Sequence, residues 1–166
     1  HDALPISPWL WPGKPWQRVH MDFATKEGHN FLVAIDSHSK WPEIIPMKST
    51  TASATVLVVR DMFAQFGLPV QVVTDNGPQF TSAEFTDFLR QNGIKHIRVA
   101  PYRPASNGAA ERMVQSFKRS LEASAGGNAT MRQRLADFLL RHRTTPHATT
   151  GRSPASLFLG RECRTR

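Results

Sequence analysis

The apolar run Phe31-Leu32-Val33-Ala34-Ile35 decides the fold class of this chain. An unbroken apolar run of strand length is typical of a strand in a sheet that is covered on both faces. Before it, residues 18–23 alternate between polar and apolar side chains, a period that indicates another strand. After it, residues 41–47 supply a third short strand, for which Pro42 favours an edge position. The short connections between these segments predict an antiparallel meander.

The second part of the chain alternates predicted helices with predicted strands. Apolar residues three and four positions apart indicate the helices, with capping residues before them and glycines after several of them. We expect helices from Thr51 or Ser53 to Phe66, from Ser82 to Gly93, from Asn107 to Ala123, from Met131 to Arg141 and near Pro154 to Leu159, with strands at 70–74 and 94–99. This order predicts an α/β domain with a mixed five-stranded sheet, three strands antiparallel and then two parallel, flanked by helices.

The composition limits the class of protein. The chain has 166 residues, 40% of them hydrophobic, which suits one domain with its own core and excludes a disordered tail, a collagen or a coiled coil. Its net charge of +8 favours a polyanionic partner, either nucleic acid or an anionic membrane surface. A solvated, soluble surface is the simpler explanation of the same charge. No run approaches the roughly 18 apolar residues of a membrane span, so we expect no membrane-spanning segment. Of the two polyanionic partners we expect nucleic acid, and no membrane.

Three carboxylates stand at positions suited to chemistry. Asp22 lies within the first predicted strand, where a charge is costly unless it is paired or binds a metal. Asp75 follows the fourth strand, at the end where ligands gather in α/β sheets, and Glu111 opens the long helix. Each has a simpler explanation. Asp22 could lie at a strand end in water, Asp75 could form an Asx turn, and Glu111 could complement the helix dipole.

Several separated motifs connect these carboxylates into one pattern. They are His20-Met21-Asp22-Phe23, Asp36-Ser37-His38-Ser39-Lys40-Trp41-Pro42-Glu43, Thr74-Asp75-Asn76-Gly77-Pro78-Gln79-Phe80, Pro104-Ala105-Ser106-Asn107-Gly108-Ala109-Ala110-Glu111-Arg112, Thr145-Pro146-His147 and Thr149-Thr150-Gly151-Arg152-Ser153-Pro154. Through them, residues 16–166 resemble the catalytic core of retroviral-type integrases, particularly those of gypsy-like long-terminal-repeat retrotransposons. The 35 residues between Asp75 and Glu111 match the spacing in that family.

The resemblance implies a ribonuclease-H-like fold and a DNA integrase of the type that uses two Asp and one Glu. Asp22, Asp75 and Glu111 would be the catalytic residues and would hold two Mg²⁺ ions, for which Mn²⁺ can substitute. Asp22 would bridge both ions, Asp75 would bind one and Glu111 the other. Two such ions can activate the attacking oxygen and stabilise the leaving oxygen at a phosphodiester. The implied activities are 3′-end processing of the element's DNA, an endonuclease step, and strand transfer into target DNA.

Two other functions compete with this polynucleotidyl transferase. One is a domesticated or remnant integrase core that acts only as a DNA- or protein-binding module. The other is a different nuclease of the same fold, a ribonuclease H or a resolvase, for which Asp36 is the nearest candidate for a fourth carboxylate. No Ser-His-Asp arrangement is evident, and Cys163 is the only cysteine, which excludes a disulfide framework and a Cys-based zinc site within the chain.

Candidate DNA contacts lie on the long helix and on the loop that enters it. Lys118 lies two turns beyond Glu111 on the same side, where its ammonium could hold a phosphate, and Gln115 shares that face. The resemblance adds Tyr102 and Asn107 on the loop. Packing of the Tyr102 ring beneath the loop and capping of the helix by Asn107 are the alternatives. Arg103 also could bind phosphate, although the family more often has His at this position.

The expected organisation has three parts. Residues 1–15 form an extended lead-in that begins with what reads as a translated sequencing adapter, residues 16–162 form the integrase core, and residues 163–166 are a truncated tail. The expected partners are double-stranded DNA, both element ends and target, and further copies of the chain in a dimer or larger homo-oligomer. The resemblance places the action in the nucleus after a phase in a cytoplasmic particle, although no targeting signal is visible.

Overall fold

The structure, a computed structural model, describes residues 13–100 and 107–165. It contains a five-stranded sheet with the order β3-β2-β1-β4-β5. β1 (Arg18–Lys26), β2 (His29–Asp36) and β3 (Pro42–Met47) are antiparallel, and β4 (Gln71–Thr74) and β5 (Lys95–Arg98) continue the sheet in parallel on the other side of β1. The predicted mixed sheet is therefore confirmed. β3 lies at the edge, as Pro42 indicated.

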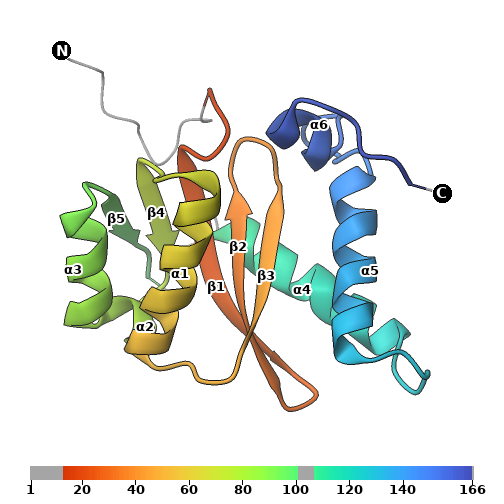
Figure 1. The fold of residues 1–166 in the computed structure, drawn as a ribbon, viewed down its shortest axis with the longest axis horizontal. Helices are drawn as coiled ribbons and strands as arrows, with labels where there is room; N and C mark the ends of the chain where they lie inside the picture. Colours follow the sequence, from red (N-terminus) through yellow and green to blue (C-terminus); the bar gives the residue numbers. More distant parts are fainter. Residues whose placement is uncertain (1–12, 101–106, 166) are drawn as a thin grey trace.

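Helices cover both faces of this sheet (Figure 1). α1 (Ala52–Phe66), α2 (Pro78–Thr81) and α3 (Ala83–Gln91) pack on one face, while α4 (Gly108–Ala123) and α5 (Met131–Thr144) pack on the other. The run Phe31–Ile35 explains the arrangement, because its alternate side chains enter different cores. Leu32 and Ala34 face α1, whereas Phe31, Val33 and Ile35 face α4 and α5.

Local sequence signals account for most helix ends. The Thr51 hydroxyl accepts a hydrogen bond from the Ala54 N–H at the start of α1, and Gly67 ends that helix with φ of 93°. Thr130 and Gln133 form a reciprocal capping box at α5. The last helix, α6 (Pro154–Leu159), has the predicted bounds. α5 continues three residues beyond the predicted end at Arg141, and α2 was not predicted, because Asn76-Gly77-Pro78 signals only a turn.

The face of β1 toward α4 is the one that carries the first candidate carboxylate. Val19 and Met21 belong to the core beneath α1, and Ala24 belongs to the core beneath α4. Alternation along the strand therefore directs Asp22 toward α4. Among the described residues, no helix has the length and apolar character needed to cross a membrane.

Candidate active site

The strand register brings Asp22 and Asp75 to the same level of the sheet. β1 and β4 run parallel, and His20 pairs with Val73 at the end of their ladder. Asp22 stands two residues beyond His20 within β1, and Asp75 stands two residues beyond Val73, directly after β4. β1 lies between β2 and β4, so Asp22 is in a central strand and not at a solvated strand end. The two carboxylates are thus neighbours although 52 residues separate them in the sequence.

Helix α4 carries Glu111 across this end of the sheet. Its buried stripe, Ala110, Met113, Val114, Phe117 and Leu121, packs against β1 and β2, as the helical spacing predicted. Just before the helix, Asn107 is 1% exposed. Its Oδ1 lies 3.1 Å from His20 Nδ1, and its Nδ2 donates to the Met21 carbonyl at 3.1 Å. These bonds fix the start of α4 to the strand residues that precede Asp22.

Electrostatics indicates that the predicted acidic residues share one environment. The pKa of Asp22 is raised to about 6, mainly by burial and also by the charges of Asp75 and Glu111, whereas a hydrogen bond from the Phe23 N–H and the Lys118 charge oppose the shift. The charge of Lys118, which lies two turns beyond Glu111 on α4, thus lowers the pKa of Asp22. The four side chains come from β1, the end of β4 and α4.

The Asp75 carboxylate is also part of a turn. Its Oδ1 accepts a hydrogen bond from the Gly77 N–H at 2.8 Å, so the Asx turn considered from the sequence is present. A Cβ at Gly77 would lie 3.0 Å from that oxygen, which explains why glycine suits the position. Within residues 13–100 and 107–165, no three His, Cys, Asp or Glu side chains form a group that could hold a metal ion. The carboxylates are therefore neighbours but do not converge on one point.

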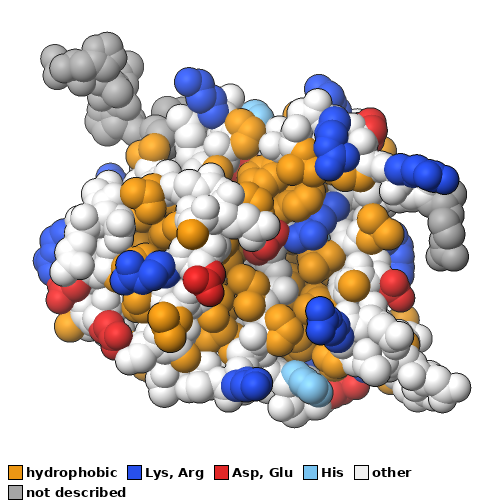
Figure 2. All heavy atoms as spheres, viewed as in Figure 1, with side chains coloured by type: hydrophobic (Ala, Val, Ile, Leu, Met, Phe, Trp, Pro, Cys, Tyr) orange, Lys and Arg blue, Asp and Glu red, His pale blue; other side chains and the backbone are white. Residues whose placement is uncertain are grey.

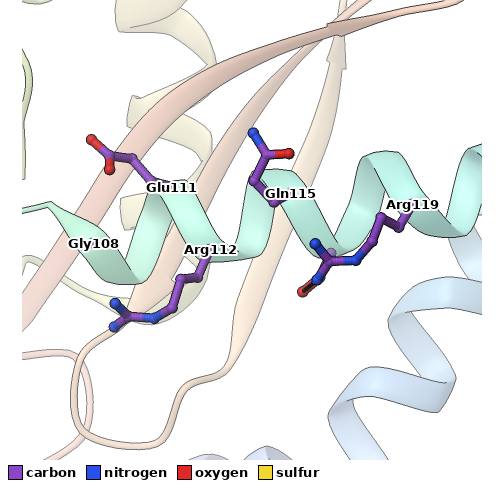
Figure 3. Close-up of a pocket in the computed structure, with 6 residues that line it drawn as sticks. Gly108, Glu111, Arg112, Gln115 and Arg119 are labelled. Atoms are coloured by element: carbon purple, nitrogen blue, oxygen red, sulfur yellow. Dashed lines mark hydrogen bonds between the residues drawn. The ribbon is translucent and has the colours of Figure 1, made fainter.

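A groove of about 620 Å³ runs along the exposed side of α4. Glu111 and Gln115 project from one side of the helix and Arg112 and Arg119 from the other (Figure 3). The groove is open and carries both charge signs beside the candidate carboxylates. It therefore offers room for an extended, charged ligand along α4.

Comparisons with known proteins identify the family. The family model described as "Integrase core domain" matches residues 12–104, which include Asp22 and Asp75. The chain belongs to the integrase core domain family. An uncharacterised protein of Caenorhabditis elegans is 38% identical over 165 residues, 98% of this integrase core and 13% of the relative. The Gag-Pol polyprotein of avian reticuloendotheliosis virus is 32% identical over 155 residues, 90% of this core and 13% of the polyprotein.

Solved structures share the ribonuclease-H-like fold of this integrase core. The catalytic core domain of BIV integrase has a TM-score of 0.73 at 23% identity, covering 87% of this chain and 95% of that one. The HTLV-2 integrase catalytic core domain in complex with magnesium has a TM-score of 0.70 at 20% identity, with coverage of 87% and 97%. The chain spans only about an eighth of the first two curated relatives, at 13% of each.

Of the other candidate residues in this integrase core, Asn107 is buried and Gln115 is exposed. Tyr102 and Arg103 lie outside the described residues. Asn107 occupies the N-cap position of α4, as the capping alternative predicted, but its side chain makes no capping hydrogen bond and its amide is used inside the protein. A DNA contact through Asn107 would require those bonds to break. Gln115 is exposed and lines the groove, which leaves its amide accessible to a ligand.

Asp36 has a structural role in this integrase core. It is fully buried, and its two oxygens accept hydrogen bonds from the Trp16 N–H, the Ser39 N–H and the Ser39 hydroxyl at 2.6–2.9 Å. These bonds close the turn between β2 and β3. The fourth carboxylate that a ribonuclease H or resolvase would need is therefore not supplied by Asp36.

Sequence reasoning missed a group of basic residues on the other side of α4. Lys40, Arg112, His142 and His147 line one pocket, although the sequence analysis gave none of them a functional role. The residues are spread from the turn after β2 to the segment after α5, and no spacing rule connects them. Only their position within the quoted motifs could have drawn attention to three of them: Lys40, Arg112 and His147.

Proposed function

We propose that this chain is the catalytic core of a DNA integrase that performs metal-dependent polynucleotidyl transfer, with 3′-end processing and strand transfer as its reactions. The observation that carries the proposal is the shared level of Asp22, in the middle of β1, and Asp75, directly after β4, with the charges of Glu111 and Lys118 acting on Asp22. Family membership supports the same class of chemistry.

The residues fit divalent metal ions by their donor chemistry. Asp22, Asp75 and Glu111 offer carboxylate oxygens, the ligands that Mg²⁺ and Mn²⁺ prefer. The raised pKa of Asp22, about 6, reflects burial and repulsion that a cation would relieve. The exposed Glu111 side chain would turn toward Asp22 to complete the site. When bound, two ions would polarise the phosphodiester and lower the pKa of an attacking hydroxyl or water.

The chain's own residues would position the nucleic acid. With a pKa of about 6, Asp22 is mainly ionised at pH 7 and above, as a metal ligand must be. Lys118 could hold a phosphate beside the reacting bond, and Gln115 could bind the strand that lies in the α4 groove. Backbone phosphate binding also accounts for the net charge of +8.

Double-stranded DNA and further copies of the chain are the proposed partners. A simian T-cell lymphotropic virus intasome resembles this fold with a TM-score of 0.79 at 22% identity, covering 95% of this chain and 59% of that one, and the HTLV-2 core is described as a trimeric form. Exposed apolar side chains are available for self-association: Leu57, Leu68, Val70, Leu140 and Leu159. Apolar side chains also spread across the middle of the face in Figure 2. Insertion into host DNA implies action in the nucleus.

Substitution of Asp75 by Asn tests the enzymatic proposal. A branched DNA oligonucleotide that mimics the strand-transfer product is incubated with Mg²⁺ or Mn²⁺, and its resolution is measured. Wild type should resolve it, Asp75→Asn should not, and both should unfold at similar temperatures. Asp137→Asn, an exposed carboxylate on α5, is the matched control and should remain active. Unchanged activity of Asp75→Asn would refute the site assignment. DNA binding by wild type without any metal-dependent cleavage or joining would favour the binding-only module.

A further inference from the structure

A second, smaller pocket lies between α4, α5 and the turn after β2. Its volume is about 260 Å³. The side chains that could contact a ligand there are those of Lys40, Arg112, Ser116, His142, His147 and Thr149. Four of the six are basic and two carry hydroxyl groups, so nearly every polar group can donate a hydrogen bond. No carboxylate lines it among the described residues.

Lys40 is an unusual residue to find at this place. Only 8% of it is exposed, whereas lysine residues are mostly exposed in folded proteins. Its φ of 66° lies in the left-handed region, which a lysine adopts at a cost and which often marks a functional site. The Lys40 N–H donates to the Asp36 carbonyl at 2.8 Å, so a short turn holds this conformation.

The charges around Lys40 are mostly of its own sign. The pKa of Lys40 is lowered to about 8, mainly by burial and also by the charges of Arg112 and Arg18, with Asp36 as the opposing carboxylate. Burial also lowers the pKa of His147, and the charges of Lys40 and Arg112 contribute to the lowering. The pocket therefore holds a local excess of positive charge.

The two histidines add imidazole nitrogens to these cations. The Thr149 N–H donates to His147 Nδ1 at 3.1 Å, which places the proton of the neutral ring on Nε2. His142 stacks on Phe138, and its Nε2 is buried without a hydrogen-bond partner among the described residues. A buried ring nitrogen without a partner is costly unless a ligand or water completes it.

We propose that the pocket between Lys40, Arg112, His142 and His147 binds a phosphoryl oxyanion. A guanidinium, an ammonium and imidazole N–H groups supply the charge-assisted donors that such an anion accepts, and the small volume suits one phosphoryl group. The anion could be free phosphate, a small phosphorylated molecule, or one backbone phosphate of DNA. Arg112 and Glu111 project from opposite sides of α4 (Figure 3), and none of the candidate metal ligands lines the pocket, although Arg112 also lines the α4 groove.

The first arm of the test uses inorganic phosphate. Phosphate titrated against the intact chain, with chloride at matched ionic strength as reference, should raise the unfolding temperature and give a measurable dissociation constant. Arg112→Gln and His147→Gln should each weaken phosphate binding by about tenfold or more, because each removes a donor to the anion. Arg141→Gln is the matched control, since this exposed arginine precedes His142 on α5 but does not line the pocket, and it should bind as wild type does.

The second arm distinguishes the source of the phosphoryl group. Binding of a labelled DNA duplex is measured by fluorescence anisotropy at constant salt, with phosphate as competitor. If the site takes a DNA phosphate, Arg112→Gln and His147→Gln weaken duplex binding more than Arg141→Gln does, and phosphate competes. If it takes a free anion, phosphate binds equally well with or without duplex. Phosphate and duplex affinities that are both unaffected by Arg112→Gln and His147→Gln would overturn the proposal.

The metal-site proposal can fail without affecting this one. Glu111→Gln, which removes a proposed metal ligand, should keep the full response to phosphate. Should either pocket variant fold poorly, the other still decides the question, because the effect is read as a change in phosphate affinity of folded protein.

Discussion

In each of the two proposed sites beside α4, burial and neighbouring groups of like charge shift the pKa of one residue. On one side, burial and neighbouring carboxylates raise the pKa of Asp22 to about 6; on the other, burial and neighbouring cations lower the pKa of Lys40 to about 8. Glu111 and Arg112 are adjacent in sequence yet belong to different sides. Like charges kept together reduce stability, and a ligand of opposite charge relieves the repulsion. The comparison therefore supports our proposal of a cation site and an anion pocket beside one helix.

The largest expected effect comes from substituting Glu111 and Arg112 one at a time. Glu111→Gln should lower metal-dependent DNA cleavage and joining by about 1,000-fold, since a metal ligand supplies several kcal/mol of transition-state stabilisation. Arg112→Gln should leave the Mn²⁺ affinity of the protein unchanged while weakening phosphate binding. Paired activity assays and Mn²⁺ titrations measure both. Equal losses of Mn²⁺ affinity in the two variants would show that the sides of α4 act as one site.

Weakening the packing of α4, the helix that both proposed sites share, should lower the free energy of unfolding. Phe117 is fully buried, with its ring 5.0 Å from Phe31 and 5.3 Å from Phe138 between centroids. Phe117→Ala should lower the free energy of unfolding by about 3–5 kcal/mol through lost burial and a cavity. Urea denaturation gives this value. A control is Lys26→Gln, which removes the exposed 2.8 Å ion pair to Glu122 and should cost at most about 1 kcal/mol. Similar losses in the two variants would contradict the packing described for α4.

Sequence patterns predicted the fold well because local signals and packing agree. The alternation in β1, the unbroken run in β2 and the Thr51 and Ser82 caps each reflect short-range physics. Asp22, Asp75 and Glu111 were recognisable by motif. The role of Asn107 was not, because its partners, His20 and Met21, lie more than 80 residues away. The basic pocket likewise depends on contacts between distant segments.

Asp22 should make stability depend on pH below neutrality. Its folded-state pKa, about 6, exceeds the ordinary value of 3.8, so the folded protein binds more protons between these values and loses stability as pH rises through them. Asp22→Asn should remove this loss and raise the free energy of unfolding above pH 6 by about 1–2 kcal/mol in metal-free buffer. At pH 4, where Asp22 is protonated in the folded protein, Asp22→Asn should not raise the free energy of unfolding. Denaturant titrations across this range measure the difference, and an equal gain at pH 4 and pH 7 would exclude the proposed cause.

Lys40 should give the opposite dependence at alkaline pH. Its folded-state pKa of about 8 lies below the ordinary 10.5, so the unfolded chain binds more protons between pH 8 and pH 10.5 and stability rises with pH there. The rise should be about 1 kcal/mol between pH 8 and pH 10, and absent in Lys40→Met. The two proteins are compared by the slope of the free energy of unfolding against pH, because methionine also changes packing and hence the absolute stability. A variant that keeps the wild-type slope would show that Lys40 is not the titrating group.

The central claim is that Asp22, Asp75 and Glu111, from three separate elements, form a site for divalent cations. The most direct measurement is a crystal structure of the chain soaked with Mn²⁺, with the metal located by anomalous scattering. We expect Mn²⁺ bound by Asp22 and Asp75, with the Glu111 carboxylate turned toward it. Crystals in which Mn²⁺ avoids these carboxylates, at concentrations that support activity on DNA, would contradict the account.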